Sequence, residues 1–76
     1  MNVMSEQVQN YLQFYIAGQE YARVWKDLTS NLETQTDAAI EAAAMLEIGV
    51  NDIADDESDM MIAAFRAGFD SIQLQV

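Results

Sequence analysis

The residues best suited to chemistry in this 76-residue chain are its carboxylates. Thirteen Asp and Glu stand against three Lys and Arg, and neither His nor Cys occurs. Imidazole and thiol chemistry are therefore excluded, and a metal ion would have to be held through oxygen. Five carboxylates fall within eight positions: Asp52, Asp55, Asp56, Glu57 and Asp59. The EF-hand pattern is missing, because this segment has no glycine at its sixth position and no glutamate at its twelfth.

Three interpretations of this acidic segment are open. It is a calcium site, a solvated loop that also places negative charge at the start of the next helix, or a docking surface for a basic partner. A second group, Glu33, Asp37 and Glu41, has i, i+4, i+8 spacing, so on one helix it forms a row with a rise of roughly 6 Å between neighbours. Like charges at this spacing oppose helix stability. We therefore interpret both groups as a surface for the lysines and arginines of a protein partner, with no metal and no cofactor.

Catalytic constellations are lacking in the sequence. No histidine is present to activate any of the four serines, which are Ser5, Ser30, Ser58 and Ser71. The chain has no glycine-rich phosphate loop, and a short helical protein has little room for a pocket that excludes water. We predict no catalytic residue and no enzyme activity.

Charge also argues against nucleic acid and membrane as direct partners. The formal net charge of -10 repels phosphate and anionic lipid, and the three basic residues, Arg23, Lys26 and Arg66, are too few for the phosphate contacts of even non-specific binding. No apolar run approaches the roughly 18 residues of a membrane span. The first residues also lack the basic and apolar regions of a signal peptide. We expect a cytoplasmic protein with a basic protein partner.

The elements that must position the carboxylates are predicted to be helices. The chain has no proline, only three glycines and 51% hydrophobic residues, which is typical of a folded helical protein and leaves few turns for a sheet. We predict one acidic all-α domain over residues 1–76, a small three-helix bundle with a long first helix. That helix begins near Ser5 and runs to about Leu28.

Two starts are possible for the second helix. Ser30 and Glu33 have the spacing of a capping box, and Thr36 is an alternative start before the alanine-rich segment. We expect the helix to end near Ile48, with Gly49 in the left-handed conformation.

A connection over residues 50–58 then precedes the third helix, which is predicted from Ser58 or Asp59 to about Phe69. Its apolar spacing places Met61, Ala64, Phe65 and Gly68 on one side. Residues 71–76 alternate polar with apolar, so they form either a helix end or a short extended tail that pairs with another chain.

The first helix has two apolar stripes at helical spacing. One contains Val8, Tyr11, Leu12, Tyr15 and Ala22, and the other contains Phe14, Ala17, Tyr21, Val24 or Trp25, and Leu28. Two stripes have two interpretations. Either one stripe packs against the other helices of the chain and the second against another protein, or both form one broad face that fills a groove between two helices of the same chain. A chain this short also has a marginal core of its own. We therefore predict a homodimer in which the first helix self-associates through its aromatic residues, Tyr11, Phe14, Tyr15, Tyr21 and Trp25.

Most of the negative charge belongs to the second part of the chain. Residues 31–76 hold ten carboxylates and one cation, whereas residues 1–30 hold three carboxylates and two cations. We interpret the protein as a non-enzymatic interaction protein that binds and blocks a basic, nucleic-acid-handling surface of a partner. In size, charge and helicity it resembles the small acidic inhibitors, including nucleic-acid mimics, that bacteriophages and mobile elements encode against host defences. The alternative is a small scaffold subunit that associates through its aromatic helix.

One short segment supports a further alternative. Gly68-Phe69-Asp70-Ser71-Ile72 resembles the Gly-x-Asp-Ser-Leu/Ile segment of acyl and peptidyl carrier proteins, in which the serine receives phosphopantetheine. The resemblance implies that Ser71 is an attachment site. It covers five positions, and the two helices that follow the serine in that family have no counterpart in the five residues after Ser71.

Overall fold

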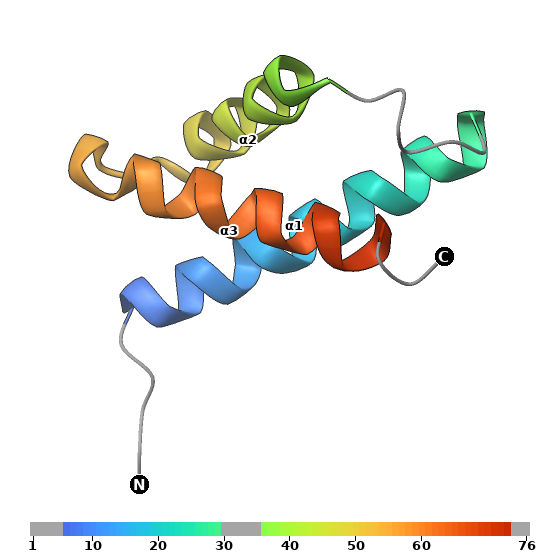
Figure 1. The fold of residues 1–76 in the computed structure, drawn as a ribbon. Helices are drawn as coiled ribbons and strands as arrows, with labels where there is room; N and C mark the ends of the chain where they lie inside the picture. The colour runs from blue at the N-terminus through green and yellow to red at the C-terminus, as the bar shows by residue number, and fades with distance from the viewer. Residues whose placement is uncertain (1–5, 30–35, 74–76) are drawn as a thin grey trace, which may run out of the picture.

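Three helices make up the part of the chain that the computed structural model describes, residues 6–29 and 36–73 (Figure 1). They are α1 (Glu6–Thr29), α2 (Asp37–Asn51) and α3 (Asp55–Gln73), and these described ranges contain no strand. The predicted all-α, three-helix fold with a long first helix is confirmed. α3 is the central element, since it packs against both other helices, whereas α1 and α2 make few contacts with each other.

The closest approach in the fold is between α1 and α3, where two glycines face backbone. A methyl group on Gly18 would collide with the carbonyl oxygen of Phe65 and lie 2.8 Å from the carbonyl carbon. A methyl group on Gly68 would meet the carbonyl of Tyr15 in the same way. Figure 1 shows the two helices crossing near their middles. Only glycine allows this packing, because any side chain at either position would occupy the space of the facing backbone.

One apolar core surrounds the crossing point. Its buried residues come from all three helices and are Phe14, Ala22, Ile40, Ala44, Met61, Ala64, Phe65, Phe69 and Ile72. The ring of Tyr21 lies tilted against Phe65 and Phe69, with centroid distances of 5.6 and 6.0 Å. The predicted inward side of the third helix is confirmed, because Met61, Ala64, Phe65 and Gly68 are all buried. Burying each large apolar side chain contributes about 1.5–3 kcal/mol.

The start of α2 corrects the predicted row of carboxylates. Thr36 is the N-cap, and its hydroxyl accepts a hydrogen bond of 3.2 Å from the backbone N–H of Ala39. The backbone of Thr36 is extended, with φ -83° and ψ 156°, so the helix begins here and the preferred start at Ser30 is wrong. Glu33 lies outside the described residues. Asp37 and Glu41 share α2.

The end of α2 is also different from the prediction. The left-handed residue is Asp52, with φ 54° and ψ 49°, and no glycine among the described residues has a positive φ. Asp52 N–H donates to Gly49 O (3.4 Å) and Ile53 N–H to Ile48 O (3.2 Å), the paired bonds of a Schellman motif. Ile53 packs against the core. The helix therefore continues past Gly49 to the point where the chain can turn and bury Ile53.

α3 begins three residues earlier than the earliest predicted start. Ala54 precedes it and has no side-chain acceptor to cap the free amides, but three acidic residues occupy the first turn: Asp55, Asp56 and Glu57. Their negative charge at the positive end of the helix dipole stabilises this start. At the other end, α3 continues past the predicted end near Phe69 to Gln73. Residues 71–73 are therefore helical, as the first of the two interpretations of residues 71–76 predicted, and residues 74–76 lie outside the described residues.

The glycine crossing predicts opposite effects for three similar substitutions. Gly18→Ala and Gly68→Ala should each destabilise the protein by about 1–3 kcal/mol, because the new methyl forces packed backbones apart. Gly49→Ala is the matched control, since a methyl there meets nothing within 4 Å and the residue lies in a helix. It should stabilise the protein by about 0.5–1 kcal/mol. Urea unfolding followed by circular dichroism measures all three, and equal effects would contradict the packing described.

Candidate functional site

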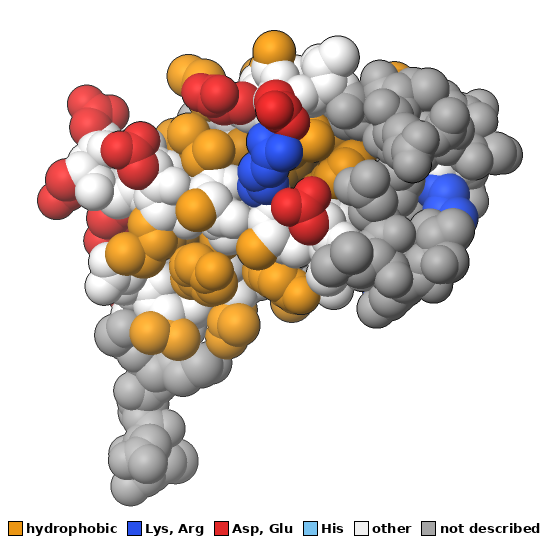
Figure 2. Space-filling view, in the orientation of Figure 1, with side chains coloured by type: hydrophobic (Ala, Val, Ile, Leu, Met, Phe, Trp, Pro, Cys, Tyr) orange, Lys and Arg blue, Asp and Glu red, His pale blue; other side chains and the backbone are white. Residues whose placement is uncertain are grey.

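The structure gathers carboxylates at the end of the molecule where α2 turns into α3. Asp52 lies in the turn, Asp55, Asp56 and Glu57 in the first helical turn, and Asp59 one turn further on. All except the half-buried Glu57 are exposed. We call these five residues the acidic end. Figure 2 shows acidic side chains concentrated at this side of the molecule.

Arg66 of α3, the one Lys or Arg in residues 31–76, is already paired with carboxylates. Arg66 donates to the Asp37 carboxylate at 2.7 Å and approaches Asp70 at 3.9 Å, and these are the ion pairs among the described residues. The hydrogen bond from Arg66 to Asp37 raises the pKa of Arg66 above its ordinary value. Asp37 is therefore partly neutralised, whereas Glu41 and the acidic end have no cation beside them in the described ranges. No three acidic residues in those ranges converge in a way that could hold a metal ion.

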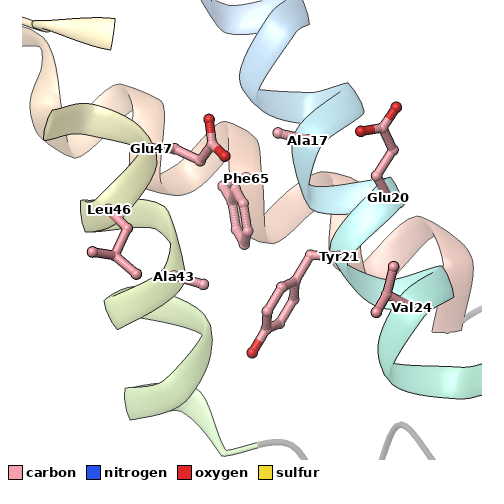
Figure 3. Close-up of a pocket in the computed structure, with 8 residues that line it drawn as sticks. All are labelled: Ala17, Glu20, Tyr21, Val24, Ala43, Leu46, Glu47 and Phe65. Carbon is pink, nitrogen blue, oxygen red and sulfur yellow. The ribbon is translucent and has the colours of Figure 1, made fainter. Parts of the chain in front are cut away.

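An apolar groove runs between α1 and α2, with α3 as its floor (Figure 3). Its volume is about 350 Å³. Ala17, Tyr21 and Val24 line it from α1, Ala43 and Leu46 from α2, and Phe65 from α3. Two of the wall residues are largely exposed, Leu46 at 73% and Val24 at 58%. The groove thus presents apolar surface to solvent in a protein that is otherwise strongly acidic.

Each wall of the groove also carries one carboxylate. Glu20 comes from α1 and Glu47 from α2, and Figure 3 shows both near the same end of the groove. Glu47 is half-buried, and its side chain accepts a hydrogen bond of 3.2 Å from Asn51 Nδ2, which holds it in place on α2. Tyr21 extends from α1 into the space between the two helices. The site therefore combines an apolar floor with negative charge at one end.

The aromatic residues predicted for self-association face the chain's own core to different degrees. Phe14 is 1% exposed and lies in the interior, where it offers no surface to a partner. Tyr11, Tyr15, Tyr21 and Trp25 are half-buried. Tyr11, Tyr21 and Trp25 pack against the buried residues of the same chain. Much of the aromatic area on α1 is thus used within the chain, as the alternative of one broad face anticipated.

Sequence reasoning missed the residues that make the apolar surface. No role is predicted above for Leu46, Glu47 or Glu20. The signal available in the sequence was the presence of three further large apolar residues on the second helix, Met45, Leu46 and Val50, and the structure leaves all three largely exposed. A surface helix that exposes three large apolar residues is unusual enough to indicate a contact.

Ser71 is half-buried where α3 packs against α1. Its hydroxyl donates to Gly68 O at 2.7 Å and accepts from Gln19 Nε2 of α1 at 3.1 Å. Attachment of a group to this oxygen would remove the bond that it donates and would push against α1. The geometry gives the carrier-protein alternative no support.

Comparison with known proteins found no matching family model, no matching curated protein and no matching solved structure. None of the described helices combines the length and the apolarity that a membrane-crossing segment needs.

The bond between Gln19 and Ser71 predicts a measurable link between α1 and α3. Ser71→Ala should lower the free energy of unfolding by about 1 kcal/mol, the net value of a typical hydrogen bond. Ser58→Ala is the matched control, because that hydroxyl donates only to Ala54 O, one turn away. A double-mutant cycle with Gln19→Ala separates the pairwise part, and a coupling energy of zero would show that the bond contributes nothing.

Proposed function

We propose that this protein is a non-enzymatic acidic interaction protein that binds a basic segment of a protein partner in the groove between α1 and α2 and blocks it. The observation that carries the proposal is the pairing of an apolar groove with carboxylates, one on each wall, in a molecule of net charge -10. A partner must satisfy both features at once.

The apolar part of the groove favours one kind of ligand. Leu46 and Val24 offer exposed hydrophobic surface on the two walls, and the buried Phe65 lies beneath them at the floor. Grooves of this type accept the apolar face of an amphipathic helix, whose large side chains at positions i, i+3 or i+4, and i+7 fill the space between the walls. We therefore propose a helical segment with two or three apolar anchors.

The charge defines what must flank those anchors. Glu47 points toward the groove and Glu20 lies at its rim beside α1 (Figure 3), so a lysine or arginine at this end of the ligand would meet the Glu47 carboxylate in the field of Glu20. The acidic end adds five more along the α2–α3 turn. Such an arrangement steers a basic partner and speeds its association, and added salt weakens the effect.

Blocking follows from the chemistry of such a partner. Lysines and arginines on one side of an exposed segment are typical of surfaces that contact nucleic-acid phosphates. A protein that occupies them would prevent phosphate binding, which is the action of the small acidic inhibitors that this chain resembles in size and charge. Direct binding of nucleic acid by the protein itself is not proposed, because the net charge of -10 repels phosphate and Arg66, one of the three cations, is paired.

The proposal is tested with a synthetic helical peptide that has leucines on one face and lysines at one end, beside the same peptide with glutamates in place of the lysines. We expect the lysine peptide to bind and to weaken as salt rises, and the glutamate peptide not to bind. Isothermal titration calorimetry measures both, and equal affinity for the two peptides would contradict the proposal.

Paired variants locate the site. Leu46→Gln should weaken peptide binding about tenfold or more, the effect of losing about 1.4 kcal/mol or more at an anchor. Met45→Gln removes a comparably exposed side chain outside the groove and should leave the affinity unchanged. For charge, Glu47→Gln should weaken binding of the lysine peptide, and Glu41→Gln, which removes one charge on α2 outside the groove, should weaken it less. Equal losses within either pair would show that binding does not use the groove.

A further inference from the structure

A second apolar surface lies on α1, away from the groove. Val8, Leu12 and Ile16 are exposed by 46%, 43% and 52%, and Met60 of α3 by 42%. Val8, Leu12 and Met60 line one cavity of about 190 Å³ together with Tyr11 and Gln7, so α1 and α3 present a continuous surface here. We call Val8, Leu12, Ile16 and Met60 the apolar patch.

The α1 side of this patch is free of charge. Residues 7–19 contain no Asp, Glu, Lys or Arg, although the whole chain has a net charge of -10 and Met60 directly follows Asp59 of the acidic end. Figure 2 shows hydrophobic side chains gathered over α3 and the first half of α1, with the acidic side chains mostly toward the edges of that face. Two copies of an acidic protein repel each other over most orientations. They can approach at least electrostatic cost where this surface meets itself.

The patch is also self-complementary. Leu12 stands midway between Val8 and Ile16, with four residues on each side, so the spacing reads the same in both directions along the helix. If two α1 helices pack antiparallel, Leu12 meets Leu12 of the second copy, and Val8 of each chain meets Ile16 of the other. This is the arrangement that a twofold axis requires, in which one patch contacts its own image.

We propose that two copies of the chain associate through the apolar patch, with their α1 helices antiparallel about a twofold axis beside Leu12. Glutamines border the contact at positions 9 and 13 and supply polar groups without adding charge. The dimer differs from the one predicted from the sequence, because it uses aliphatic residues in place of the aromatic ones.

The dimer leaves the groove accessible. Ala17 and Tyr21 of the groove follow Val8 and Leu12 by nine positions, which is about two and a half helical turns, so they point to the opposite side of α1. Glu20 of the groove follows Ile16 by one turn and lies at the edge between the two surfaces. The apolar part of the groove therefore stays open in the dimer, and dimerisation is tested separately from partner binding.

Sedimentation equilibrium across a range of protein concentrations and salt tests the association. We expect a monomer–dimer equilibrium that shifts toward the dimer as salt rises from about 0.1 to about 1 M, because screening then reduces repulsion between the chains. Partner binding should respond to salt in the opposite direction. A species of 8.5 kDa at every concentration and salt would overturn the proposal.

Two substitutions locate the interface. Leu12→Glu should weaken the dimer by about a hundredfold or more, since one change removes two symmetric contacts and adds two like charges. Leu46→Glu places the same change on the groove and should leave the dimer intact. Circular dichroism checks that both variants are folded, which is expected because both side chains are already exposed. Equal weakening by the two variants would place the interface elsewhere.

The absence of cysteine allows a test of orientation. Two cysteines form a disulfide when their Cα atoms lie within about 7 Å. Under mild oxidation, Leu12→Cys should cross-link with itself, Val8→Cys and Ile16→Cys should each stay largely uncrosslinked, and a mixture of those two should form a mixed disulfide. Self-cross-linking of Val8→Cys and of Ile16→Cys would indicate parallel helices and overturn the antiparallel arrangement.

Discussion

Backbone contact between α1 and α3 at Gly18 and Gly68 is the constraint on which the rest of the structure depends. With no side chain between them at this point, the helices come together closely and must diverge on either side. Phe14, Phe65 and Phe69 fill the space beside the crossing and exclude water from it. The third helix then has one free side, and α2 packs there through Ile40 and Ala44. The small core of a short chain is thus organised around two residues that add no volume.

The same constraint accounts for both apolar surfaces. Because α2 rests on α3 and hardly touches α1, the space between α1 and α2 is incompletely filled, and Phe65 lies at its floor. On the other side of α1, no helix in the described part of the chain covers Val8, Leu12 and Ile16, since α3 crosses near Gly18. Three helices of this size cannot enclose all the apolar residues of a chain that is 51% hydrophobic.

Local patterns in the sequence were sufficient for the helices and the inward side of α3, because Met61, Ala64, Phe65 and Gly68 repeat at helical spacing. Helix ends were harder. Gly49 looked like a helix terminator, but the burial of Ile53 moved the left-handed residue to Asp52, which is a tertiary effect. The groove was beyond prediction for the same reason, since it depends on where α2 rests. The acidic end was apparent from the sequence, because its residues are neighbours along the chain.

The crossing also has a consequence for the order of folding. α2 and α3 are joined by three residues, so their contacts close a short loop. Gly18 and Phe65, in contrast, are separated by most of the chain, and bringing them together has the larger entropic cost. The contact that defines the fold is therefore among the most distant in sequence. A nascent chain has all of α1 long before it has the residues that α1 packs against, so its apolar faces stay exposed until synthesis reaches α3.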